Sequence, residues 1–165
     1  MLISNVLKES TLAHDLDDSR LARFVTLARE EEHPSGTTLF LEGDDLTDLY
    51  VVAEGSVVLT MDYQLREQAS TLQSVVTVVE AGGTFGWSSV LEPHVATLSA
   101  RTRGPCTVVA IDGRELARVM DDDPVIGYQV MKALAGLVTH RLQATRNSLI
   151  SERGLELRSI PVPVS

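Results

Sequence analysis

The chain has 165 residues, 44% of them apolar and only 4% aromatic, so we expect one domain with a core of Val, Leu and Ala. Fourteen Lys and Arg against 23 Asp and Glu give a net charge of −9, which repels a phosphate backbone and argues against direct nucleic-acid binding. A single cysteine, Cys106, excludes an intramolecular disulfide and a four-thiolate iron–sulfur cluster, and favours a reducing cytoplasm.

The first predicted element is a helix that begins near Asp17. Acidic and hydroxyl residues at 17–19 are placed to cap its N-terminus. We expect it to end before His33 and Pro34. Its apolar positions follow helical spacing and are Leu21, Ala22, Phe24, Val25 and Ala28.

From Gly36 the pattern changes to short β-rich runs separated by glycine turns. The polar stretch 61–73 is predicted to be a mobile hairpin or loop. Roughly seven strands within about 75 residues favour a jelly roll or a similar closed double sheet. The β-rich runs on which this rests lie at 39–41, 49–53, 57–60, 75–80, 95–102 and 106–111.

The pattern becomes helical again at 112–114, and a long helix is predicted over 124–152 after the break at 121–124. Its apolar positions approach the spacing of a coiled coil and predict a homodimer through this helix. The alternative is that the helix only folds back on its own barrel. These positions are Tyr128, Met131, Leu134, Leu137, Val138, Leu142 and Leu149, with Thr145 on the same side.

The predicted organisation is therefore a barrel with N-terminal helices over 1–123, a dimerisation helix over 124–153 and a flexible tail over 154–165. Gly154 is the expected end of the helix. No basic segment followed by an apolar stretch opens the chain, and no run approaches roughly 18 apolar residues, so neither an export signal nor a membrane span is expected.

The segment 82–91 is the most informative for function. Its glycines allow a close backbone approach, and Ser88 and Ser89 open a short helical turn. Unpaired N–H groups at a helix start can hold an anion without a lysine. The alternative interpretation of such a segment is a tight turn without a ligand.

The order of these motifs over 16–151 resembles the cyclic-nucleotide-binding domain family, which includes bacterial catabolite activators and protein kinase A regulatory subunits. The resemblance implies a mainly β fold with flanking helices, in which a double-stranded β-helix or jelly-roll barrel precedes a long C-terminal helix. It also implies a regulatory function and not an enzyme. The motifs are 36–40 with 42–44, 49–52 with 54–57, the cassette 83–91, 93–97 with Ala100, and the helix segment 140–145.

The chain departs from that family where the ligand is held. The family's cassette reads Phe-Gly-Glu, whose glutamate accepts a ribose hydroxyl, and an arginine before Ser-Ala or Thr-Ala holds the cyclic phosphate. By this resemblance Trp87 replaces the glutamate, His94 replaces the arginine and Val95 replaces the hydroxyl residue. Indole has no acceptor for a ribose hydroxyl, and imidazole offers a single directed donor to the phosphate. Losing each of the two charged partners typically costs roughly 2–5 kcal/mol of binding free energy, which argues against family-like binding of cyclic AMP.

Arg141 matches a position that packs near the cassette acid in the activators, and is expected to meet an anion or to stack on Trp87. Arg101 and Arg103 are expected to point away from His94 on the same strand. The structural alternatives are a plug for Trp87, a hydrogen-bonded strand histidine for His94 and an ion-pair role for Arg141. The candidate ligand-binding residues are Phe85, Gly86, Trp87, Ser88, Ser89, His94, Val95, Arg141 and Thr145, the last by its match to a position that reaches the base.

Two functions follow from these observations. One is a sensor that binds a cyclic nucleotide or another small anionic ligand, and the other is a ligand-independent dimeric docking module that has lost nucleotide binding. A metal-dependent barrel enzyme is not expected, because His14, His33, His94 and His140 are isolated and only His94 is expected on a barrel strand. No catalytic or metal site is therefore predicted, and haem binding stays open.

An activator of the resembling type would need roughly 60 further residues after the long helix for its helix-turn-helix, and about a dozen remain. We therefore expect the output to pass through a protein partner that the sequence does not identify. Neither nucleic acid nor a membrane is an expected partner.

Overall fold

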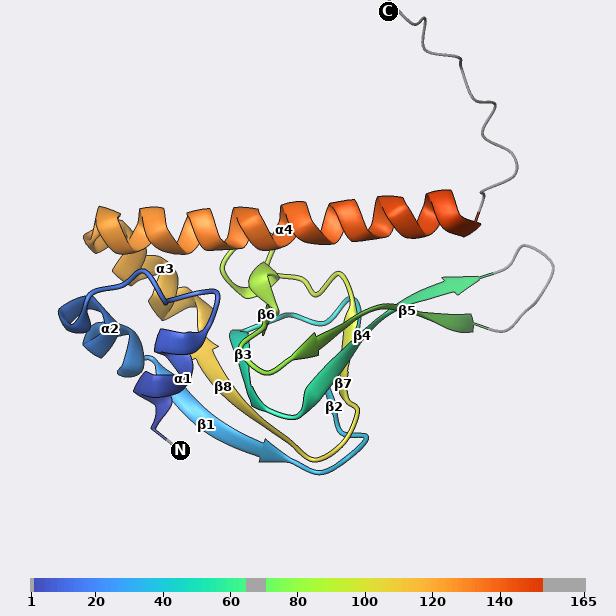
Figure 1. Cartoon of the computed structure of the whole chain (residues 1–165), viewed down its shortest axis with the longest axis horizontal. Helices are drawn as coiled ribbons and strands as arrows, with labels where there is room; N and C mark the ends of the chain where they lie inside the picture. The colour runs from blue at the N-terminus through green and yellow to red at the C-terminus, as the bar shows by residue number, and fades with distance from the viewer. Residues whose placement is uncertain (1, 65–70, 153–165) are drawn as a thin grey trace, which may run out of the picture.

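The computed structural model describes residues 2–64 and 71–152, which form two antiparallel four-stranded sheets flanked by helices (Figure 1). The sheets have the orders β1-β8-β3-β6 and β2-β7-β4-β5. The mainly β barrel with flanking helices and a long C-terminal helix is thus confirmed. The elements are α1 (Ile3–Glu9), α2 (Asp18–Val25), β1 (Ala28–His33), β2 (Thr38–Phe40), β3 (Asp48–Glu54), β4 (Ser56–Gln64), β5 (Thr71–Glu80), β6 (Thr84–Phe85), the 3₁₀ helix η1 (Trp87–Ser89), β7 (Ser99–Thr102), β8 (Cys106–Asp112), α3 (Gly113–Asp122) and α4 (Pro124–Glu152).

The central strands β3 and β8 are buried on both faces, which explains their continuous apolar sequences. Successive side chains of a strand point to opposite faces of the sheet. Tyr50 and Val52 of β3 therefore pack inside the barrel, whereas Leu49 and Val51 pack against the helices. Two cores result, one between the sheets and one between the first sheet and the helical layer that α1, α2, α3 and α4 contribute.

The N-terminal region differs from its prediction. The first helix of the chain is α1, which the sequence did not predict and which buries Val6 and Leu7. The predicted helix ends at Val25, where α2 stops, and β1 follows instead of further helix. Strand β1 pairs with β8 from Ala28 opposite Ile111, and this pairing outweighs the helical spacing of the sequence.

In the segment 61–73 the described residues 61–64 and 71–73 are antiparallel strand, so of the predicted hairpin or loop the structure shows the two arms of a hairpin, and 65–70 lie outside the described residues. β4 and β5 continue their pairing through Asp62 opposite Gln73, and Gln73 Nε2 donates to Asp62 Oδ1 at 2.9 Å. The polar sequence fits this extension, because Met61, Asp62 and Gln73, whose side chains are described, are all exposed to solvent.

The predicted strand over 95–102 begins only at Ser99. His94 has a φ of 61°, a left-handed conformation that no strand contains, and Val95 forms only an isolated bridge with Asp45. His94 is therefore not on a strand. The prediction that Arg101 points away from it was wrong in its premise, because the two residues do not share a strand. The histidine that does lie on a barrel strand is His33, at the end of β1.

Helix α4 has the predicted bounds and two different apolar faces. Its inner face buries Ile126, Val130 and Leu134 against the rest of the domain. Leu134 and the partly buried Leu137 thus pack inward, and only the other described positions of the predicted stripe are left for a partner helix. The side chain of Leu149, Gly154 and the tail 154–165 lie outside the described residues.

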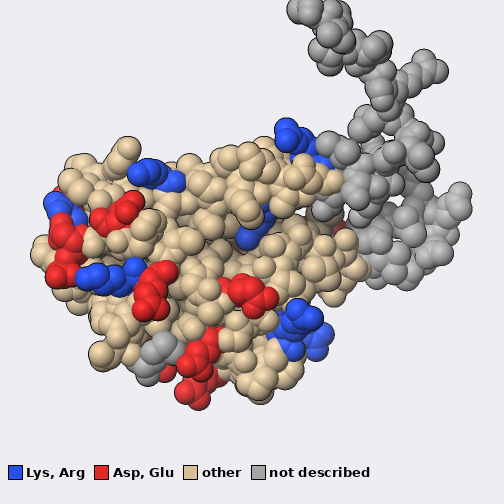
Figure 2. All heavy atoms as spheres, in the orientation of Figure 1, with Lys and Arg blue, Asp and Glu red and all other residues tan. Residues whose placement is uncertain are grey.

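The outer face of α4, which we define as Tyr128, Met131, Ala135, Val138, Leu142 and Thr145, is exposed along its whole length. Tyr128 and Leu142 are 69% and 68% exposed, a large fraction for apolar side chains. Figure 2 shows few charged side chains along the ridge that α4 forms, whereas acidic side chains gather on the domain below it. Within the described part of the chain no helix, α4 included, has an apolar stretch that could cross a membrane.

An ion pair between half-exposed Arg29 and buried Asp48 ties β1 to β3 and predicts a pH dependence of stability. The Asp48 side chain is 9% exposed, and its carboxylate accepts from Arg29 Nη1 and from Thr47 Oγ1, each at 2.7 Å. Burial alone would raise the pKa of Asp48, but the hydrogen bonds from Arg29 and Thr47 outweigh it and hold that pKa below its usual value. This carboxylate therefore stabilises the fold above the unfolded-state pKa near 4 and loses that contribution as the pH falls through its lower folded-state pKa.

We accordingly expect Asp48→Asn to lower the free energy of unfolding by about 1–3 kcal/mol at pH 7 and to make stability less dependent on pH below about 5. Urea unfolding between pH 3 and pH 7 measures both effects. The exposed Asp62→Asn variant is the control. A deficit for Asp48→Asn that stays constant down to pH 3 would contradict this role of the carboxylate.

Candidate functional site

The cassette backbone is a sharp turn from β6 into η1. Gly86 has a φ of 79°, and a Cβ there would lie 3.0 Å from the Asp48 carbonyl oxygen, so both conformation and space require glycine. The buried Ser89 hydroxyl donates to Gly86 O at 2.8 Å. Ser89 therefore fixes the turn and does not offer its hydroxyl to a ligand.

The start of η1 has two backbone N–H groups that come before the first hydrogen bonds of the turn. The first bonds within the turn run from Ser89 N to Gly86 O and from Val90 N to Trp87 O, each at 3.1 Å. The amides of Trp87 and Ser88 precede these bonds, as the first N–H groups of a helix do. Together with Gly86 these two residues line a small cavity.

This cavity has a volume of about 20 Å³. That is room for roughly one water molecule, whereas small-molecule sites usually measure about 300–1,000 Å³. A nucleotide therefore cannot enter unless side chains move. The lining consists of Phe40, Leu46, Leu59, Gly86, Trp87, Ser88, Ala96, Thr97, Leu98 and Arg141.

Trp87 and Arg141 both line the cavity and contact each other. The Arg141 guanidinium carbon lies 4.2 Å from the centroid of the indole, a cation–π contact that links η1 to α4. Trp87 is half-buried and also packs against the core beneath the helices. From the sequence we expected Arg141 either to meet an anion or to stack on Trp87. The structure shows the stacking.

Arg141 is an unusual cation in this acidic chain. Its side chain is half-buried, and burial lowers the pKa of the guanidinium, which still stays protonated at all ordinary pH values. Within residues 2–64 and 71–152 it forms no ion pair with an acid. A half-buried positive charge therefore lies on the wall of the cavity that η1 also lines.

Several predicted residues lie elsewhere than the sequence suggested. Phe85 is fully buried and stacks on Tyr50, with ring centroids 5.0 Å apart. His94 Nδ1 lies 3.0 Å from Ser89 O, so its ring is held by the backbone. Neither His94 nor Val95 lines the cavity, and exposed Thr145 does not line it either.

Residues 96–98 form part of the cavity wall, two residues beyond the predicted pair 94–95. None of these three residues is charged, so Arg141 is the cation that lines this cavity. Phe40, Leu46 and Leu59 were missed because they come from strands and turns that only the closed barrel brings to the cassette. Among the described residues no group of three His, Cys, Asp or Glu could hold a metal ion.

Comparison with known families identifies the domain. A model of the family described as "Cyclic nucleotide-binding domain" matches residues 30–123, more than half of the chain. The chain belongs to the cyclic nucleotide-binding domain family. This cyclic nucleotide-binding domain is also 25% identical over 147 residues to the "CRP-like cAMP-activated global transcriptional regulator" of Mycobacterium tuberculosis. The match covers 89% of this chain but 62% of that regulator, so the chain spans less than two thirds of its curated relative.

Solved structures agree with this assignment. The N-terminal domain of a transcriptional regulator from Streptomyces coelicolor A3(2) has 25% identity and a TM-score of 0.65, covering 82% of this chain and 93% of its own. A cyclic nucleotide-binding domain from Methylobacillus flagellatus superposes with a TM-score of 0.77 over 96% of this chain and 85% of its own. At 18% identity that second match shows the fold alone.

Proposed function

We propose that this cyclic nucleotide-binding domain is a regulatory sensor that binds a small anionic ligand between η1 and α4. The observation that carries the proposal is Arg141, a half-buried cation on the cavity wall that has no acidic partner among the described residues. An anion would replace the missing partner and could also accept from the amides of Trp87 and Ser88. The family and the regulatory relatives make a cyclic nucleotide the first ligand to test.

Entry of such a ligand requires Arg141 to leave the face of Trp87, because the closed cavity holds only about 20 Å³. Arg141 belongs to α4, so this movement acts directly on the helix that would carry the signal. Trp87 offers no acceptor for a ribose hydroxyl, and the ligand is therefore recognised through its anionic group.

The proposed output element is a homodimer through the outer face of α4. The outer-face residues alternate spacings of three and four, which is the pattern of a coiled-coil interface. Leu142 and Thr145 of this face are one and four residues from Arg141. Displacement of Arg141 can therefore change the pairing of the two helices.

We expect a thermal-shift screen to find an anion that stabilises the protein and loses its effect in Arg141→Ala. A ligand at 100 times its Kd stabilises the folded state by about 2.7 kcal/mol. Arg146→Ala, an exposed arginine of the same helix, is the matched control and should respond as the natural protein does. The screen should contain cyclic AMP, cyclic GMP, cyclic dinucleotides and unrelated anionic metabolites.

The second candidate is a ligand-independent dimerisation or docking module. It is favoured by the small volume of the cavity, which Trp87 and Arg141 fill, and by the uncharged wall at 96–98. For such a module no anion shifts the melting temperature at millimolar concentration while the dimer persists. That pair of results would overturn the sensor proposal.

A further inference from the structure

A continuous groove runs along one side of α4. Two cavities of about 540 Å³ and about 480 Å³ lie between this helix and the rest of the domain, and they share the lining residues Thr11, Leu137 and His140. The α4 residues that line them extend from Gln129 to Ala144, a rise of about 22 Å along the helix axis. None of these residues belongs to the outer face of α4, so the groove is separate from the proposed dimer interface. Its length fits an extended chain of about seven residues.

One wall of the groove is the free edge of a sheet. Strand β5 is the last strand of the order β2-β7-β4-β5, and among the described residues it pairs with β4 alone. Every residue of β5 from Val76 to Glu80 lines the groove. Successive side chains of a strand point to opposite faces of the sheet, so a groove lined by all five residues runs along the edge of the strand and not across one face. Backbone groups of β5 that β4 leaves unpaired therefore lie in this groove.

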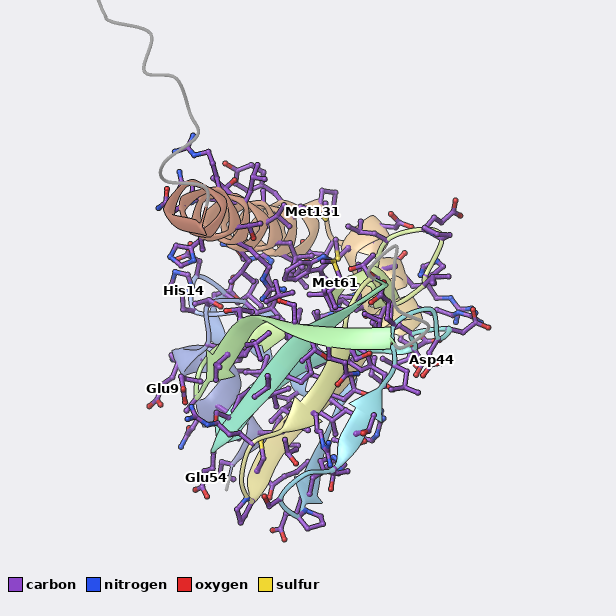
Figure 3. The ribbon with its side chains drawn as sticks, turned by 90° about the vertical axis from the view of Figure 1, so that its right-hand side faces the viewer. Glu9, His14, Asp44, Glu54, Met61 and Met131 are labelled. Carbon is purple, nitrogen blue, oxygen red and sulfur yellow. The ribbon has the colours of Figure 1, made fainter. Side chains whose placement is uncertain are left out.

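A buried acceptor towards the other end of the groove also lacks a donor. Gln129 Nε2 donates to Asp15 O at 3.0 Å, whereas Gln129 Oε1 is buried and has no partner within residues 2–64 and 71–152. His14, next to Asp15, lies below α4 in Figure 3, and Glu9 lies lower on the same side of the domain. Buried polar atoms nearly always have a hydrogen-bond partner, so the occupant of this groove should bring a donor. An extended peptide carries N–H donors along its whole length.

We propose that residues 153–165 of the same chain occupy this groove and pair with the free edge of β5. They follow Glu152, the last residue of α4, and lie outside the described residues. Glu152 is eight residues beyond Ala144, about 12 Å along the helix, a distance that about four extended residues cover. The residues that remain can span about 30 Å, enough for the whole groove.

The sequence of this segment suits an added edge strand. Ile160, Val162 and Val164 alternate with Pro161 and Pro163, and a proline biases the residue before it towards extended backbone. Alternate residues of a strand direct their backbone groups to opposite sides, so both prolines can turn away from β5 while the three apolar residues offer N–H groups to it. The prolines have no N–H for a further strand, so the added strand also closes the edge of the sheet.

Charge and attachment favour this segment over a separate chain. Residues 153–165 contain two arginines and one glutamate, whereas the whole chain has a net charge of −9. A segment of positive charge is attracted to an acidic domain, and a second acidic copy is repelled from it. Attachment to the end of α4 gives the segment a high effective concentration at the groove.

Hydrogen exchange of the full chain, followed residue by residue by NMR, tests the proposal. We expect the β5 amides that β4 leaves unpaired, and the amides of Ile160, Val162 and Val164, to exchange at least about tenfold more slowly than unpaired amides. Val162→Asp places a carboxylate without a partner in the groove and should abolish this protection in both segments. Ser159→Asp adds the same charge on the opposite face of the proposed strand and should retain it. Unchanged protection of β3 and β8 establishes that each variant is folded.

Substitutions of α4 test the groove itself. A Cβ on Gly136 would meet nothing within 4 Å, so the groove is empty beside this glycine. Gly136→Phe should fill that space and release the segment as Val162→Asp does, whereas Gly136→Ala should keep it bound. Leu142→Asp, on the outer face, should also keep the protection, because the segment belongs to the same chain.

Four results would each overturn the proposal. They are fast exchange of both segments in the natural protein, equal exchange in Val162→Asp and Ser159→Asp, full protection in Gly136→Phe, and loss of protection in Leu142→Asp. The last of these results would assign the segment in the groove to a partner chain.

Discussion

In the homodimer that we propose through α4, Leu142→Asp is expected to convert dimer to monomer at micromolar concentration, with at least about a 100-fold rise in the dimer dissociation constant. Leu142 is 68% exposed and lies near the C-terminal end of the outer face of α4, where two copies would bury it. A carboxylate at that position would be desolvated without a partner, once in each chain. Sedimentation equilibrium measures the change directly.

The matched control is Gln143→Asp. Gln143 is also exposed and adjacent in sequence, but it does not belong to the outer face. It should leave the dimer intact, and both variants should keep the fold of the single chain because neither residue is buried in it. Equal dissociation constants for the two variants would place the dimer interface elsewhere.

The sequence predicted the bounds of α4 but not which residues it buries. Pro124 after three aspartates specifies the start, and the length follows from the uninterrupted apolar periodicity. Leu134 and Val138 both fit that periodicity, yet Leu134 is 2% exposed and Val138 is 44% exposed. Two apolar stripes on one helix overlap in sequence, and only the position of the barrel decides which stripe faces inward.

Only the part of the candidate site that depends on local backbone was predicted from the sequence. The cassette 83–91 and Arg141 were identified because glycines and the family pattern specify local backbone. His94 was misplaced because a left-handed residue interrupts the expected strand and shifts the cavity wall to 96–98. Strand β1 was missed because its polar edge sequence has no β signature, and its pairing with β8 is a long-range contact.

The closed state of the cassette should depend on a measurable coupling between Trp87 and Arg141. Trp87→Ala removes a large, half-buried side chain and should lower the free energy of unfolding by about 2–4 kcal/mol. Arg141→Ala alone should lower the free energy of unfolding by less. In the folded state the guanidinium gains the cation–π contact, but its partial burial costs it solvation.

A double-mutant cycle isolates the contact between the two residues, and we expect a coupling of about 1 kcal/mol from urea unfolding without ligand. Trp87→Phe retains an aromatic face and should preserve part of that coupling, which distinguishes stacking from simple loss of volume.

The same coupling opposes ligand entry, because the anion must separate Arg141 from Trp87. Trp87→Ala should therefore raise the affinity for any anion that Arg141 binds, by about fivefold if the whole coupling is released. An affinity that instead falls in Trp87→Ala would mean that the indole contacts the ligand and does not close the cavity against it.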